Sequence, residues 1–218
     1  MTDDWKKQVF RQKSLWEVYT LSRAELPKPI FNSAVFWISA FVLSVVFVWS
    51  IGIGHEVYSL SEALTLTQTV ANSGFVLAVG ILGFLIAGFS IFASVTKDEL
   101  FITLAKIPYR KSSINRLQFV FFNFLNVFTV YVGLLAICLF SIILFSEQSP
   151  LIRLITFAAP DYQQFAVPIL FLVVCSIMQW ILSAILKLKS FIWNLYQTVL
   201  VTIATESELQ DQKERKHS

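Results

Sequence analysis

The sequence predicts an all-α integral membrane protein, a four-helix transmembrane bundle with amphipathic interfacial helices. All but one of its 17 Lys and Arg residues fall in three short regions, at 6–28, 97–116 and 187–216. Four stretches without a charged side chain separate them, at 31–54, 63–96, 117–146 and 162–186. Each is long enough, as a helix, to cross a hydrocarbon core of about 30 Å. With 56% apolar residues, the 218-residue chain leaves little for a separate soluble domain.

The distribution of positive charge also predicts the topology. Cationic loops resist translocation, so the N-terminus, the loop 96–116 and the C-terminus should all lie in the cytoplasm. An even number of crossings permits this. Arg153 is then the one cation expected outside.

Residues 1–30 form the first predicted element, a cytoplasmic amphipathic segment that mixes Trp, Phe and Tyr with Lys and Arg. We expect it to rest on the inner leaflet. Pro27 and Pro29 break any helix there, since proline lacks a donor and restricts its predecessor, and so begin span one at 31–53.

Ser59 and Glu62 have capping-box spacing in the outer loop, so a helix should begin there and run into span two, at 74–95. Small residues recur along span two at steps of three and four: Gly80, Gly83, Ala87, Ser90 and Ser94. Such a stripe lets another helix approach closely and gain dispersion and hydrogen bonds. It predicts either packing against another span, which we favour, or a subunit interface.

The basic loop 96–116 contains Thr96 and Glu99 at capping-box spacing, followed by apolar residues at helical spacing. A short amphipathic helix should therefore follow, ending at Pro108. Four cations of this loop are candidate contacts to lipid or to a partner protein: Lys106, Arg110, Lys111 and Arg116. An anchoring contact with anionic headgroups is favoured over a docking surface.

Span three (117–145) and span four (165–186) both carry amides in their cytoplasmic halves. Asn123 and Asn126 lie on span three and Gln179 on span four. An amide in hydrocarbon needs a partner, so we expect these three groups to make polar contacts between helices. Lining a hydrated cavity is the alternative. Residues 187–218 form an amphipathic helix, which either lies on the inner leaflet or extends span four, and a charged tail.

The residues needed for common catalytic sites are scarce. Two His are far apart in sequence, and the two Cys lie within apolar spans. No phosphate-binding loop or nucleophile elbow is present. We therefore expect no enzyme activity, no cofactor and no metal. Since the four spans contain no Asp, Glu, Lys, Arg or His, an ion-coupled transporter is disfavoured. The modest net charge of +3 gives no reason to expect direct nucleic-acid binding.

Two functions fit these features. The first is a non-enzymatic oligomeric scaffold or sensor that couples the envelope state to a cytoplasmic partner. The second is a pore-forming or membrane-disrupting effector in which the amides of spans three and four line a hydrated path. A third is the membrane anchor of an enzyme complex. The span count, both termini inside and the segment GFLIAGFSIFASVTKDELF at 83–101 resemble small four-span proteins of bacterial anti-phage defence loci, and more loosely the membrane subunits of Kiwa systems. The resemblance implies an inner-membrane homo-oligomer that senses phage damage and works with a soluble cytoplasmic subunit.

Overall fold

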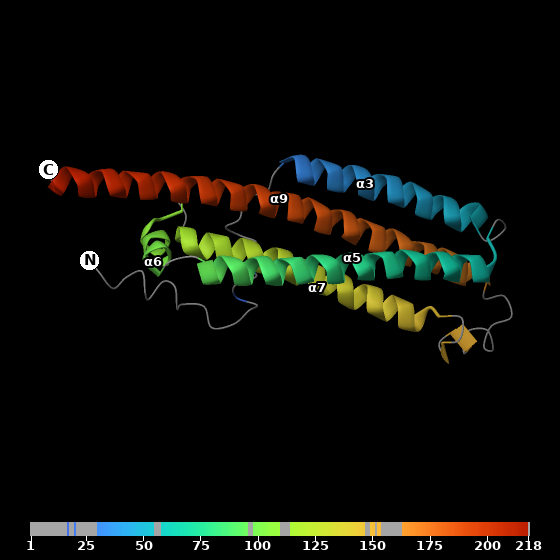
Figure 1. Ribbon diagram of the computed structural model, residues 1–218. Coiled ribbons are helices and arrows are strands. Elements are labelled where there is room, and N and C mark those ends of the chain that lie inside the picture. The colour runs from blue at the N-terminus through green and yellow to red at the C-terminus, as the bar shows by residue number, and fades with distance from the viewer. Residues whose placement is uncertain are drawn as a thin grey trace. The chain divides into compact units, whose positions relative to one another are not determined.

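The computed structural model of the chain is helical throughout most of its length (Figure 1). It describes residues 17, 20, 30–54, 58–95, 98–109, 114–146, 149–150, 152–153 and 163–217. Its helices are α3 (Ile30–Trp49), which ends in a π-helical turn at Ser50–Gly54, α5 (Leu60–Val95), α6 (Asp98–Lys106), α7 (Arg116–Leu144) and α9 (Gln163–His217). Four of them, α3, α5, α7 and α9, are long and apolar enough to cross a membrane, as the four predicted spans require.

Helix α5 begins where the capping box predicts. The Ser59 backbone N–H donates to Glu62 Oε2 at 2.8 Å, and the Glu62 N–H donates back to Ser59 Oγ at 3.3 Å. The threonines that follow do not interrupt the helix, because their hydroxyls donate to carbonyls one turn earlier, as in Thr67 to Ala63 at 2.8 Å. The apolar helix therefore starts at Leu60, well before the predicted start of span two at residue 74.

Helix α9 decides between the two arrangements predicted for 187–218. It runs without a break from Gln163 to His217, so these residues extend span four rather than fold back (Figure 1). No Gly or Pro occurs between 187 and 217, and nothing in the local sequence ends the helix. The apolar part of α9, Phe165–Val201, has 37 residues.

The helices divide into two compact units. One contains Lys28–Phe84 and Thr129–Leu186, and the other contains Leu85–Phe128 and Lys187–Ser218. Helices α5, α7 and α9 each contribute to both units, whereas α3 belongs to the first and α6 to the second.

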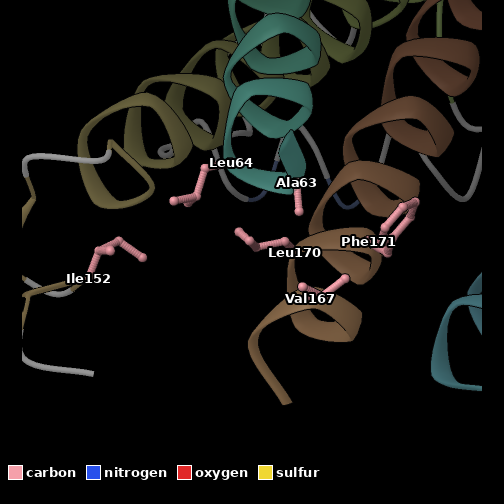
Figure 2. Packing of buried hydrophobic residues seen from close by; sticks show 6 residues of the cluster. All are labelled: Ala63, Leu64, Ile152, Val167, Leu170 and Phe171. Carbon is pink, nitrogen blue, oxygen red and sulfur yellow. The ribbon is translucent and has the colours of Figure 1, made fainter. Parts of the chain in front are cut away.

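In the unit that contains α3, one end of α5 and the first turns of α9 enclose a cluster of buried apolar side chains (Figure 2). Ala63 and Leu64 come from α5, and Val167, Leu170 and Phe171 come from α9; Ile152 joins them from the segment between α7 and α9. The Tyr58 ring packs edge-on against Phe171, with centroids 5.3 Å apart. These contacts hold the beginnings of α5 and α9 together.

The unit that contains α6 is held by aromatic rings. Phe89 of α5 stacks on Phe124 of α7 with ring centroids 4.6 Å apart, and Phe124 also contacts Phe191 of α9 at 6.3 Å. Phe92 of α5 contacts Phe101 of α6 at 5.9 Å. Aromatic pairs of this kind contribute about 0.5–1.5 kcal/mol beyond their area burial.

Several predictions fall outside the described residues. These are the interfacial segment 1–30 apart from Glu17, Thr20 and Ile30, the capping role of Thr96, and the cations Arg110 and Lys111. Helix α6 itself is present where the sequence predicts it and ends at Lys106, two residues before Pro108.

Candidate functional site

Within the described part of the chain, the predicted small-residue stripe of α5 does not pack against another helix. All five of its residues are exposed: Gly80, Gly83, Ala87, Ser90 and Ser94. A Cβ added at Gly80 or Gly83 would have no atom of the described residues within 4 Å, and the same holds at Gly88. Among the described residues, therefore, no helix packs on the stripe as we favoured from the sequence. The stripe is an open helix face.

A different stripe of α5 makes the contacts inside the chain. Its members are small and almost fully buried, and they recur at helical spacing: Ala63, Thr67, Ala71, Gly74 and Ala78. At about 100° per residue, this face lies roughly opposite the exposed stripe. A Cβ added at Gly74 would lie 2.7 Å from Cys138 Sγ of α7 and 3.2 Å from Ile181 Cδ1 of α9. Three helices thus meet closely at Gly74.

The sequence contained a signal for this buried stripe. Four of its five residues lie N-terminal to Ala78, in a region that contains Thr65, Thr67, Gln68, Thr69 and Asn72. The predicted span two began at 74, so its small-residue stripe did not include these earlier positions. Counting small residues at steps of three and four from Ala63 onward would have found the stripe.

Gln179 finds its partners on α3. Its side-chain Nε2 donates to the Phe36 carbonyl at 3.1 Å, and its Oε1 accepts from the Ser39 hydroxyl at 2.9 Å. Further along the same pair of helices, Asn32 Nδ2 donates to the Leu186 carbonyl at 3.1 Å, and the Cys175 thiol donates to the Leu43 carbonyl at 3.7 Å. Polar contacts therefore join α3 to α9 along most of the length of α3. From the sequence, we had expected the Gln179 amide to contact the amides of span three.

Among the described residues, one of the two asparagines of α7 has a side-chain oxygen without a partner. Asn123 is buried. Asn126 is half-buried, and its side-chain Oδ1 has no hydrogen-bond partner among the described residues. The same is true of the Tyr131 hydroxyl, which is also buried on α7. Helix α7 instead meets α9 through Trp180, whose Nε1 donates to the Val130 carbonyl at 3.3 Å.

The described part of the basic loop forms a tight turn from α6 into α7. The Tyr109 N–H donates to the Ile114 carbonyl and the Arg116 N–H to the Ile107 carbonyl, both at 3.0 Å. Tyr109 also stacks on Phe119, with ring centroids 3.9 Å apart. Asn115 caps α7, since its Oδ1 accepts from the Gln118 N–H at 2.8 Å. These contacts hold residues 107–109 against the start of α7.

Two of the four predicted contact cations are described. Lys106 is exposed at the end of α6. Arg116 is half-buried, and its Nε has no hydrogen-bond partner among the described residues. The exposed ammonium of Lys106 is free to meet a headgroup or a partner, while the Arg116 side chain is partly enclosed by its own chain.

Metal-ligating side chains are scattered within the described part of the chain. Within the described ranges, no three His, Cys, Asp or Glu residues come together as a metal site would require. Cys138 and Cys175 are both free and buried. Comparison with protein-family models, curated proteins and solved structures finds no match. The function therefore has to be argued from the open faces of the helices.

Proposed function

We propose that this chain is a non-enzymatic scaffold or sensor that oligomerises in the bacterial inner membrane with both termini in the cytoplasm. In this proposal it couples the state of the envelope to a soluble cytoplasmic partner. The observation that supports it best is the exposed small-residue stripe of α5. The inside location of both termini rests on the three basic regions of the sequence.

The exposed stripe of α5 lacks large apolar side chains, which favours an interface between helices. Lipid tails are as apolar as leucine, so small side chains gain nothing from facing lipid, but they let two backbones approach. Gly80 and Ser94 are fourteen positions apart in α5, which corresponds to about 21 Å of helix. With no described atom near Gly80 or Gly83, that length remains open to a second copy of α5.

The Ser90 and Ser94 hydroxyls do not reach across the stripe in the monomer. Each donates to a carbonyl of its own helix, Ser90 to Ile86 at 2.9 Å and Ser94 to Ile91 at 3.0 Å. These side chains therefore present a small surface without an unsatisfied donor, which suits close packing in a medium without water.

The pore-forming alternative receives less support. It needs amides that line a wet path, yet the Gln179 amide is bonded to α3 through both its nitrogen and its oxygen. A continuous polar stripe would also be required through the whole bilayer. The scaffold or sensor is therefore the function that the geometry favours.

Association in membranes tests the proposal directly. The full chain, labelled in separate preparations with a donor or an acceptor fluorophore, is reconstituted in vesicles and diluted with lipid while energy transfer is followed. We expect transfer in the wild type and a loss of most of it in Gly80→Leu and Gly83→Leu, because a leucine separates the two backbones. Neither change should unfold the monomer, since the added side chain meets no described atom within 4 Å at its Cβ.

Ile86→Phe is the matched control. Ile86 is 53% exposed on the same helix, but lies roughly 80° around it from the stripe. It should leave energy transfer unchanged. A wild type that transfers no energy at any lipid dilution would contradict the oligomer.

The defence role needs its own test, since it rests on the resemblance. Cells expressing the wild type with its neighbouring genes are challenged with phage, and plaque formation is compared with that of cells expressing Gly83→Leu. We expect protection to be lost in the variant while membrane expression remains equal. Equal protection by both chains would separate any defence function from oligomerisation.

A further inference from the structure

Helix α9 has more apolar length than a membrane can enclose. Its apolar part, Phe165–Val201, has 37 residues, which as a helix is about 55 Å long. Even at a tilt of about 40°, a hydrocarbon core of about 30 Å encloses only about 39 Å of helix. Lys187 and Lys189 mark where the excess begins, since charged side chains avoid hydrocarbon. In the proposed membrane location, about ten apolar residues after these lysines therefore lie outside the hydrocarbon core.

This excess carries an exposed apolar face. Six large side chains that follow the lysines are each between 44% and 61% exposed: Ile192, Trp193, Tyr196, Val199, Leu200 and Ile203. At about 100° per residue, they fall within about 120° of one side of the helix. Another side of the same turns packs inside the chain, where Phe191 is buried and contacts Phe124 of α7 at 6.3 Å.

The spacing of the exposed face is that of a coiled coil. Four of its residues follow one another at steps of four, three and four: Ile192, Tyr196, Val199 and Ile203. This alternation is that of the d and a positions of a heptad, and the four residues form the seam of α9. Trp193 and Leu200 then occupy e positions, which border the seam. Lys189 precedes the seam at an a position, where a single polar residue fixes the register between strands.

Lipid does not reach this seam. Helix α9 is unbroken past Lys187 and has no Gly or Pro there, so it does not fold back onto the leaflet. Val199 is twelve positions past Lys187, about 18 Å along the helix, or about 14 Å deep at a tilt of about 40°. The headgroup region is only about 5–7 Å deep. An apolar face beyond it lies in water and requires a protein cover.

A second copy of the chain fits this face. Copies inserted in the same direction present the same residues at the same height and in parallel, as a parallel coiled coil requires. The six exposed side chains leave roughly 500 Å² open in each chain. Pairing two chains therefore covers roughly 1,000 Å², which is the area that a specific interface needs.

We propose that residues 192–203 of α9 pair with the same residues of another copy as a parallel coiled coil. The proposal rests on the proposed function, because a seam of two heptads is short and association through α5 raises the local concentration of the two extensions. It adds a second interface, outside the hydrocarbon core, to the one proposed for α5.

Single-cysteine crosslinking in the full-length protein tests the seam. Tyr196→Cys and Ile203→Cys are each expressed alone, and membranes are treated with a mild oxidant. A disulfide requires Cα atoms no more than about 7 Å apart, and seam residues of two parallel strands meet their own counterparts. We expect both variants to form a dimer that reductant reverses. The native Cys138 and Cys175 are buried, so the wild type should give no dimer and serves as the blank.

Gln197→Cys and Ala204→Cys are the matched controls. Each replaces the residue that follows a seam residue and is also exposed in the single chain, but it lies about 100° further around the helix. Their dimers should form about tenfold more slowly than those of the seam variants. Equal rates for Tyr196→Cys and Gln197→Cys would overturn the proposal, since chance collisions do not distinguish the two faces.

An acid within the seam provides a second test. Val199→Asp is added to Ile203→Cys, and Gln197→Asp is added to it separately as the control. A carboxylate enclosed between helices is costly, so Val199→Asp should slow the disulfide by about tenfold, whereas Gln197→Asp should leave its rate unchanged. Equal slowing by both acids would show that no helix encloses the seam and would overturn the proposal.

Energy transfer between labelled chains separates this proposal from the α5 interface. Val199→Asp should retain energy transfer, because α5 is unchanged. Wild-type chains that transfer energy, together with seam variants that form no disulfide, would overturn the coiled coil alone. The absence of both signals would overturn the proposed oligomer as well.

Discussion

Replacing Gly74 with Ala is the most informative single change in the long apolar helices of this protein. The new methyl carbon would lie 2.7 Å from Cys138 Sγ and 3.2 Å from Ile181 Cδ1. The Ile181 terminal methyl can move aside, but Cys138 is 0% exposed and its sulfur can move only by changing rotamer inside a packed core. Overpacking of this kind costs about 1–3 kcal/mol, against a helix-propensity gain of about 1 kcal/mol for Gly to Ala. We expect a net loss of about 1 kcal/mol.

Unfolding of the purified protein from mixed micelles by increasing SDS measures this difference. Cys138→Ala removes the opposing sulfur, so the double variant should be less destabilised than the sum of the two single variants. Gly80→Ala and Gly88→Ala serve as controls on the same helix, since a Cβ there meets no described atom within 4 Å. Under conditions where the protein is monomeric, they should be neutral or slightly stabilising. Equal effects at Gly74 and Gly80 would refute the assignment of the two faces of α5.

Two further substitutions test local contacts. Gln179→Leu removes the hydrogen bonds to Phe36 and Ser39. Because interhelical hydrogen bonds in membranes average about 0.6 kcal/mol, we expect the free energy of unfolding to fall by about 1 kcal/mol in the same SDS assay. An unchanged unfolding midpoint would argue against the α3–α9 contact. Ser59→Ala removes the acceptor for the Glu62 N–H and should cost about 1 kcal/mol at the start of α5. Hydrogen exchange of the first-turn amides should be about fivefold faster, with exchange near Ala78 unchanged.

The four spans and the cap of α5 could be predicted because they depend on local sequence. Uncharged stretches separate the basic regions, and Ser59 and Glu62 are close enough in the chain to recognise each other by spacing alone. The end of α6 before Pro108 was predicted for the same reason, because the proline ring acts on its immediate neighbours.

The faces of α5 could not be predicted in this way. Two stripes of small residues occupy opposite sides of one helix, and both satisfy the same spacing rule. Which of them packs inside the chain depends on where α7 and α9 place Cys138 and Ile181, side chains that are far from Gly74 in sequence. The partner of Gln179 was missed for a similar reason. Its expected depth in the bilayer is shared by residues of several helices, and only the packing of α3 against α9 determines which of them it contacts.

Charge patterning and hydropathy were enough to predict the four long apolar helices, because the cost of placing a charge or an unpaired backbone group in lipid depends on each segment alone. The tertiary structure was needed to show that α9 continues unbroken past Lys189, that Gly74 is enclosed and that Gly80 and Gly83 are open. Those outcomes depend on the match between side chains from distant parts of the chain, and a close contact between two helices cannot be computed from either helix by itself.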